Sequence, residues 1–171
     1  MTQELFMHFD PATSQNTRRL IPGYDQLEPR RLVRMFEFSL VWQLFEGRVF
    51  QSEDVAVRIQ EYWYRGLHAE IAEQTAADFH FFKHRYQDAD DATHRFDILL
   101  GDRGENLRLC IQSGLADDAN DHQKTRACAA VCYRLRNNLF HGRKADYGFE
   151  EQDGNFERAT HFMNTCLHVL V

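Results

Sequence analysis

Residues 29–47 read PRRLVRMFEFSLVWQLFEG and predict a long helix. Pro29 suits the first helical position, because its φ is already helical and no hydrogen bond is needed from its nitrogen there. Apolar side chains occupy nearly every face between Leu32 and Phe45, which is typical of a buried helix. Gly47 is a natural residue at which such a helix ends. We therefore expect residues 29–47 to form the central and most buried helix of the fold.

The remainder of the chain also favours helices. All three prolines lie within the first 29 residues, and Val, Ile and Thr together number only 21 of 171 residues. A long proline-free segment that is poor in stiff β-forming residues favours helix over sheet. We predict an all-α bundle of about five helices in residues 28–171. Turn and loop signals dominate residues 1–27, which we expect to form an N-terminal arm.

The other helices are predicted from apolar residues that repeat at spacings of three and four. Asn120 and Gln123 form a predicted capping pair at the start of one helix, and Gly142 would end it. The remaining expected segments are a helix from a Ser52 cap to about residue 86, an acidic loop at 88–92, a short helix with a helical or irregular piece at 96–115, and a last helix at 156–170.

The composition excludes several classes of protein. A net charge of −6 and a pI near 5.8 exclude a broadly basic nucleic-acid coat protein, although they allow a local basic site. The first residues lack the pattern of a signal peptide, and no segment approaches the roughly 20 apolar residues that span a bilayer. We therefore expect a cytoplasmic protein without a membrane partner, whose four cysteines are reduced and pack in the core.

The densest basic segment is residues 133–144, YRLRNNLFHGRK. It contains no acid, it includes His141, and its cations are Arg134, Arg136, Arg143 and Lys144. Cations near the C-terminal end of a helix are favoured by the helix dipole. On charge alone, a helix end with basic side chains is a sufficient explanation of this segment.

The order of residues 136–142, RNNLFHG, closely resembles the signature of the HEPN family of small helical domains. The family pattern is an Arg, a polar residue directly after it, and a His a few positions further on. Here Arg136, Asn137 and His141 match that pattern. Residues 40–45, LVWQLF, also look like the first helix of many members.

The resemblance implies a HEPN-like helical bundle that acts as an endoribonuclease without a metal ion or another cofactor. RNA carries its own nucleophile, the 2′-hydroxyl, so such a site needs only a base near neutral pKa and a cation. His141 is the implied base, Arg136 would stabilise the charge on the phosphorane, and Asn137 would orient either the histidine or the phosphate. The expected products are a 2′,3′-cyclic phosphate and a 5′-hydroxyl. The flanking RNA backbone would be bound by Arg134, Arg143 and Lys144.

The spacing of the two motif residues points to a homodimer. Five residues on a continuous helix turn by about 500°, so Arg136 and His141 would point about 140° apart. Both can face one scissile phosphate only if the helix ends near His141 or if a second copy of the chain completes the site. HEPN proteins typically dimerise with their motifs facing each other, and we expect a composite site at a homodimer interface. The resemblance also implies a toxin or phage-defence effector, which could have a cognate antitoxin.

Two other interpretations stay open. One is a non-catalytic HEPN module that binds nucleotide or RNA, or that serves only in dimerisation. The other is a metal-dependent protein, because His80 and His84 have a spacing that can ligate zinc. Nearby in sequence are Asp88, Asp90, Asp91 and His94. A solvated polar face explains the same histidines without a metal. Glu46 is expected either as an acid near the site or as a salt-bridge partner at the edge of the core.

Overall fold

The computed structural model describes residues 28–51, 54–61, 68–101, 104–140 and 152–170, so the predicted arm of residues 1–27 lies outside the described residues. The elements in chain order are α2 (Pro29–Phe45), η2 (Glu46–Phe50), α3 (Val55–Glu61), α4 (His68–Gln74), α5 (Ala76–Lys83), η3 (His84–Asp88), α6 (Ala92–Leu100), α7 (Glu105–Leu115), α8 (Asp121–Phe140) and α10 (Asp153–Leu170). No strand occurs in these ranges, which confirms the all-α prediction. The expected number of about five helices is wrong, because eight α-helices and two π-helical turns occupy the described residues.

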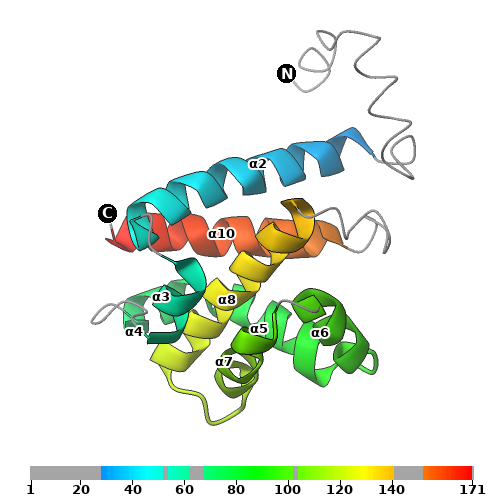
Figure 1. Ribbon diagram of the computed structural model, residues 1–171, viewed down its shortest axis with the longest axis vertical. Helices are drawn as coiled ribbons and strands as arrows, with labels where there is room; N and C mark the ends of the chain where they lie inside the picture. Colours follow the sequence, from blue (N-terminus) through cyan, green and yellow to red (C-terminus); the bar gives the residue numbers. More distant parts are fainter. Residues whose placement is uncertain (1–27, 52–53, 62–67, 102–103, 141–151, 171) are drawn as a thin grey trace, which may run out of the picture.

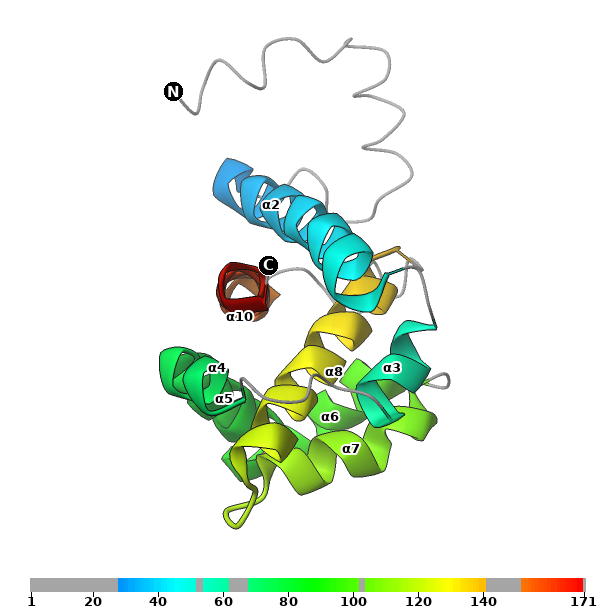
Figure 2. The same cartoon turned by 90° about the vertical axis from the view of Figure 1, so that its left-hand side faces the viewer.

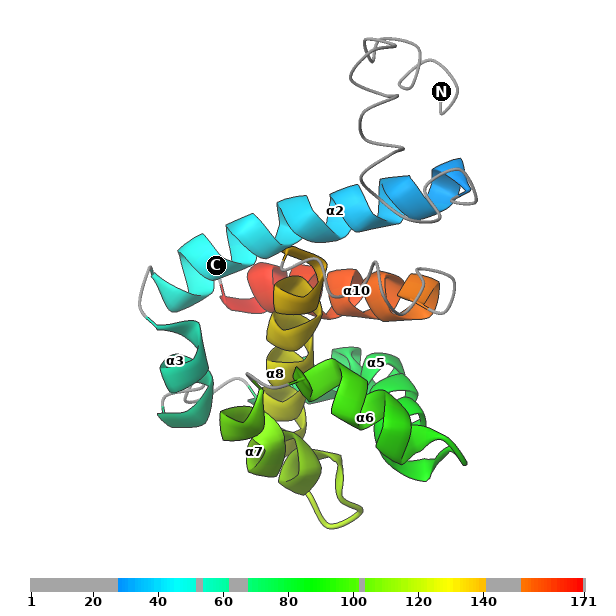
Figure 3. The same cartoon turned by 45° about the vertical axis from the view of Figure 1, so that its right-hand side comes forward.

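The helices form two layers that α8 connects (Figure 1). In one layer, α2 and α10 run side by side in the same direction, and the ion pairs Arg31–Asp153 and Arg34–Glu157, each at 3.1 Å, join them. Helices α3 to α7 form the second layer. Helix α8 extends from the second layer up to α2 and α10, as Figure 3 shows most clearly. Helix α8 is therefore the central element.

The centre of α8 consists of short side chains. Residues 127–132 read ACAAVC, and all of them are buried. Short side chains allow neighbouring helices to pack closely against α8. Helix α7 comes so close at Gly114 that a Cβ there would collide with the carbonyl oxygen of Gln123 and the side chain of Ala127.

The predicted capping pair at the start of α8 is confirmed. The backbone N–H of Asn120 donates to Oε1 of Gln123 at 2.9 Å, and the backbone N–H of Gln123 donates to Oδ1 of Asn120 at 3.0 Å. This reciprocal pair satisfies two backbone donors that have no partner within the helix.

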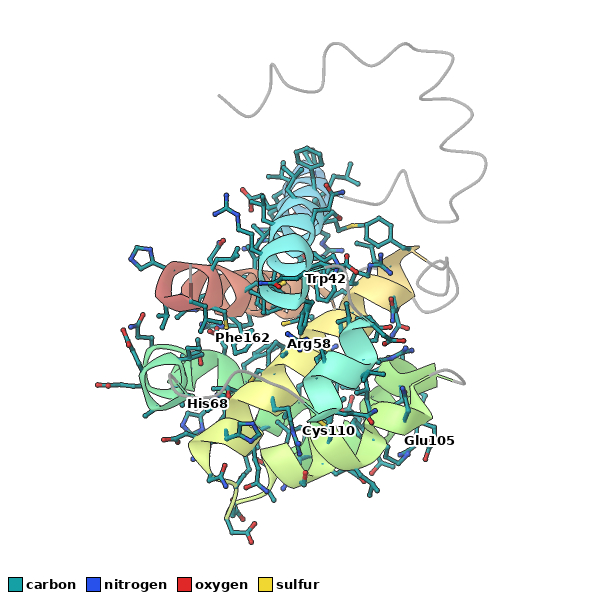
Figure 4. The ribbon with its side chains drawn as sticks, turned by 60° about the vertical axis from the view of Figure 1, so that its left-hand side comes forward. Trp42, Arg58, His68, Glu105, Cys110 and Phe162 are labelled. Atoms are coloured by element: carbon teal, nitrogen blue, oxygen red, sulfur yellow. The ribbon has the colours of Figure 1, made fainter. Side chains whose placement is uncertain are left out.

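Helix α2 is apolar on nearly all sides, but only one of its faces is buried. Figure 2 shows α2 at the outer edge of the bundle, and Figure 4 shows Trp42 on its inner side. The inner face buries Phe38, Trp42 and Phe45, whereas the outer face exposes Phe36 by 58%, Leu40 by 45% and Leu44 by 52%. The prediction that this helix is the central, most buried one is therefore wrong.

The boundaries after α2 differ from the predicted ones. Gly47 does not end the helical backbone, because the chain continues as η2 until Gln51, whose φ is 51°. Ser52, the predicted cap of the next helix, lies outside the described residues. The cap of α3 is Asp54, whose Oδ1 accepts hydrogen bonds from the backbone N–H groups of Ala56 and Val57 at 2.9 and 3.2 Å.

The helix predicted to continue to residue 86 is interrupted at Thr75. This residue has φ −106° and ψ 16°, and its hydroxyl donates to the carbonyl of Ile71 at 2.6 Å. The side chain thus takes part in a local hydrogen bond of the kind by which threonine competes with the helical backbone. The regular helix is therefore divided here into α4 and α5. Residues 96–115 form the end of α6 and the whole of α7.

All four cysteines are buried and free of disulfide bonds, as predicted. Burial raises the pKa of the thiols of Cys110, Cys128, Cys132 and Cys166 above the ordinary value. These thiols are therefore protonated core groups. Among the described residues, no helix has both the length and the apolar character needed to cross a membrane.

Candidate functional site

The candidate site lies at the C-terminal end of α8, where the motif recognised in the sequence begins. Arg136 and Asn137 belong to the last turns of this helix, which ends at Phe140. The predicted base His141 and the predicted RNA-binding cations Arg143 and Lys144 lie outside the described residues, as does the predicted stop at Gly142. The geometry of the site is therefore built from Arg136 and the side chains around it.

Arg134 is placed differently from the prediction. Its side chain is 4% exposed, and it donates hydrogen bonds to the carbonyl oxygens of Leu99 and Leu100 at the end of α6. Asn138 lies beside it, and the Asn138 side-chain amide donates to the carbonyl of Leu99 at 2.9 Å. The last carbonyls of a helix have no partner within that helix, and these two side chains supply one. The prediction that Arg134 contacts RNA is wrong, because its guanidinium caps α6 inside the protein.

Arg136 lies two positions further along α8 and keeps a partly exposed guanidinium. Its side chain is 31% exposed, and its Nη1 donates to Oδ1 of Asn137 at 2.9 Å. Nη2 lies 3.9 Å from Oε2 of Glu46, and the guanidinium carbon lies 5.3 Å from the centre of the Phe140 ring. Phe140 is itself 53% exposed. Arg136 is thus oriented from three sides and still accessible to solvent.

Glu46 is held in place by Trp42. The indole Nε1 of Trp42 donates to Oε2 of Glu46 at 2.8 Å, and the indole ring is 1% exposed. The Trp42 ring also packs on Tyr133 of α8, with 5.9 Å between the ring centres. Trp42 of the segment 40–45 and Arg136 of the motif, which the sequence analysis singled out separately, are therefore linked through Glu46.

The arrangement of these groups suits the binding of an oxyanion. A guanidinium offers a planar fork of N–H donors that matches phosphate oxygens. The contact between Arg136 and Glu46 is long, so a phosphate could replace the carboxylate at little cost. Asn137 is only 9% exposed, and its Oδ1 accepts from Arg136. Asn137 therefore orients Arg136, a partner that the sequence interpretation did not include.

The alternative metal site gains no support from the geometry. His80 and His84 are exposed, while Asp88 lies 3.8 Å from Lys83 and Asp91 lies 2.6 Å from Arg95. Within the described ranges, no three or more His, Cys, Asp or Glu side chains come together in a way that could hold a metal ion. These acids form ion pairs with neighbouring cations instead.

Two pockets lie away from the motif. One has a volume of about 390 Å³ between α4, α5 and α8, and the other has about 330 Å³ between η3, α6 and α7. Neither is lined by Arg136, Asn137 or Glu46. Arg136, Asn137, Glu46 and Phe140, together called the Arg136 cluster below, lie where α2 and α8 meet and are separate from these two pockets.

One ionisable group in the core was not predicted from the sequence, the buried carboxylate of Asp78. This side chain is 0% exposed, and its Oδ2 lies 2.6 Å from Nδ1 of His161. The two residues are 83 positions apart, so no local spacing signals the pair. The only sequence signal was an acid placed between apolar residues in the segment AADFHFFK of α5.

Comparison of the chain with models of protein families, with curated proteins and with solved structures gives no match.

Proposed function

We propose that this protein is an endoribonuclease of the HEPN type that needs no metal ion. The observation that supports this most directly is the Arg136 guanidinium, which is oriented by Asn137, Glu46 and Phe140 yet is still 31% exposed. Arg136 lies in the last turns of α8, and His141 follows it five positions later in the sequence. A guanidinium and an imidazole are the two groups that cleavage of RNA by its own 2′-hydroxyl requires.

The proposed reaction is an internal transesterification. His141 accepts the proton of the 2′-hydroxyl, and the 2′-oxygen forms a bond to the adjacent phosphorus. Arg136 stabilises the negative charge that develops on the non-bridging oxygens. The bond from phosphorus to the 5′-oxygen then breaks, and that oxygen takes up a proton. The products are a 2′,3′-cyclic phosphate and a 5′-hydroxyl.

The proposed active species is a homodimer, because the HEPN proteins that the motif resembles typically dimerise with their motifs facing each other. A second copy of this chain would bring its own pair of motif residues to the same cleft. The outer face of α2 provides apolar surface for such contact through Phe36, Leu40 and Leu44. Phe140, next to Arg136, is also half-exposed. Isolated exposed apolar residues are common, but an aligned row of them along one helix marks an interaction surface.

In this proposal, Arg143 and Lys144 bind the RNA backbone on either side of the scissile phosphate. Arg134 has no part in it, because its guanidinium caps α6. We place the protein in the cytoplasm as the effector of a toxin–antitoxin or phage-defence system. In such a system an antitoxin would have to cover the Arg136 cluster or separate the two subunits.

The function is tested by incubating the purified protein with total RNA in excess EDTA and comparing it with His141→Ala. We expect cleavage that resists EDTA in the wild type and is lost in His141→Ala, with 2′,3′-cyclic phosphate at the new 3′ ends. His168→Ala is the matched control, since His168 is an exposed histidine of α10, and it should cleave like the wild type. Activity that EDTA abolishes, or that survives in His141→Ala, would contradict the proposal.

The contact between Glu46 and Arg136 also favours a second candidate, a non-catalytic HEPN module that binds nucleotide or RNA or serves in dimerisation. A carboxylate that lies 3.9 Å from the guanidinium competes with a phosphate for it. This candidate predicts RNA binding or self-association without cleavage. Glu46→Gln separates the two candidates, because removal of the competing charge should strengthen RNA binding in both but should change cleavage only in a nuclease.

A further inference from the structure

A buried carboxylate lies in the core, and among the described residues its hydrogen-bond and ion-pair partners do not include Arg136, Asn137 or Glu46. Asp78 belongs to α5 and is 0% exposed. A carboxylate in such surroundings is costly unless cations or hydrogen-bond donors compensate it. Burial raises the pKa of Asp78, while His161 and Arg158 act in the opposite direction. The charged form of Asp78 is therefore stabilised by its partners on α10.

The partners of Asp78 extend from the core to the surface. Oδ2 of Asp78 lies 2.6 Å from Nδ1 of His161, and Oδ1 lies 3.5 Å from Nη1 of Arg158. The His161 side chain is 56% exposed and that of Arg158 is 39% exposed. Asp78 thus contacts one edge of the imidazole and one edge of the guanidinium, and both side chains are partly exposed to solvent.

The contact with Asp78 fixes which edge of the His161 ring is available. A carboxylate at Nδ1 sets the orientation and the tautomer of an imidazole and leaves Nε2 as the outward nitrogen. Nε2 of His161 has no hydrogen-bond partner among the described residues. Arg158 lies one turn earlier on the same helix, so both outward groups lie on one side of α10. The acid next in sequence, Glu157, is paired with Arg34 of α2.

We propose that Nε2 of His161 and the guanidinium of Arg158 together bind a phosphate group. The Arg158 guanidinium is a charged donor that suits a tetrahedral oxyanion. Nε2 of His161 is a second donor when the imidazole carries a proton on both nitrogens, because a neutral ring that donates from Nδ1 to Asp78 leaves Nε2 as an acceptor. The buried carboxylate of Asp78 holds the imidazole in the binding orientation and does not touch the ligand. The source that we infer for the phosphate is an RNA strand, and this part rests on the proposed function.

The site is tested by following the imidazole ¹⁵N resonances during a titration with inorganic phosphate. We expect the Nε2 signal of His161 to shift, and we expect Arg158→Gln to weaken the apparent affinity roughly tenfold, as the loss of one charge-assisted hydrogen bond implies. His161→Asn is the informative second variant, because its amide can still donate to Asp78 while Nε2 is removed. This variant should retain the thermal stability of the wild type but lose phosphate binding. His168→Asn should change neither.

The RNA part is tested in the His141→Ala background with a short single-stranded RNA, which then remains intact. A shift of His161 with both phosphate and RNA supports the whole proposal. A shift with phosphate alone supports the site and overturns RNA as the source. No shift with either probe overturns the site and leaves Asp78–His161 as a structural pair. If the wild type does not cleave RNA but phosphate still shifts the Nε2 resonance of His161, the result contradicts the proposed nuclease function and supports the phosphate site.

Discussion

Arg134 and Arg136 lie two positions apart on α8 and differ completely in their surroundings. Arg134 is buried against the end of α6, whereas Arg136 is partly exposed beside Glu46. The sequence placed both in one basic segment, since residue type and charge are identical. The difference in their surroundings arises because Arg134 donates to the carbonyl of Leu99, which is 35 positions away. Local spacing in the sequence does not indicate that contact.

This difference predicts opposite effects for two matched substitutions. Arg134→Gln should lower the free energy of unfolding by about 2–3 kcal/mol, because it leaves buried carbonyls without their charged donor. Arg136→Gln should change stability little and should reduce RNA cleavage by roughly 10²-fold, since it removes a donor to the transition state. Urea unfolding and the EDTA-resistant RNA assay measure the two effects. Equal loss of stability in both variants would contradict the assignment.

A second residue-scale prediction concerns His68, whose Nε2 is buried without a hydrogen-bond partner among the described residues. Burial and, to a lesser extent, His122 lower the pKa of His68 from its ordinary value of 6.5, while Asp121 opposes the change. The unfolded chain therefore binds a proton more readily at this position than the folded one. Above pH 6.5 His68 is neutral in both states and does not affect the free energy of unfolding. As the pH falls from 6.5 towards the lower folded-state pKa, the unfolded chain takes up a proton that the folded protein does not, so the free energy of unfolding decreases.

We accordingly expect the stability of the wild type to fall from pH 7.5 to pH 5.5 more steeply than that of His68→Gln. Thermal unfolding at both pH values measures the difference. His84→Gln provides the control, because His84 is an exposed histidine, and it should follow the wild type. Parallel pH profiles for His68→Gln and the wild type would refute the role of burial.

At the scale of elements, the sequence predicted features that depend on local contacts. The capping pair of Asn120 and Gln123 and the apolar repeats of α8 and α10 depend only on residues within one or two turns, and both are confirmed. The outer face of α2 could not be predicted, since an apolar sequence on all sides does not show which side meets a neighbour. The break at Thr75 was also missed, because threonine is tolerated within helices.

The close packing of α7 on α8 gives a prediction at this scale. Gly114→Ala should destabilise the protein by about 1–3 kcal/mol, because the added Cβ would press against the backbone of Gln123 and the side chain of Ala127. Gly47→Ala is the matched control, since nothing lies within 4 Å of a Cβ there. In the control, alanine should be neutral or stabilising by up to about 1 kcal/mol. Chemical denaturation of both variants checks this, and equal effects would argue against a close α7–α8 contact.

At the scale of the whole molecule, the candidate site results from chain segments that are remote in sequence. Glu46 and Arg136 are 90 positions apart, and Asp78 and His161 are 83 positions apart. The sequence named Arg136 and Asn137 as site residues and left two roles open for Glu46, an acid near the site or a salt-bridge partner. The bond from the Trp42 indole to Glu46 is local, but the position of Glu46 3.9 Å from Arg136 depends on the packing of α2 on α8. The types of these groups could thus be predicted, whereas the contact between the two helices could not.

The proposed homodimer gives the prediction at this scale. Leu40→Glu should weaken self-association strongly, because it places a charge in the middle of the exposed row on α2. Leu109→Glu is the control, since Leu109 is 78% exposed on α7, in the other layer. Light scattering over a concentration series measures the mass of each variant. A wild-type monomer at all concentrations, or equal effects of both substitutions, would rule out a dimer through α2.

The buried thiols have a practical consequence for measuring motion in this bundle. Cys128, Cys132 and Cys166 are at most 1% exposed and lie on α8 and α10, so an alkylating reagent reaches them only when these helices separate. Cys110 is 7% exposed on α7 and should respond to smaller openings. Mass spectrometry of the modified peptides would then time the opening of each layer separately, with the protein's own sulfur atoms as reporters.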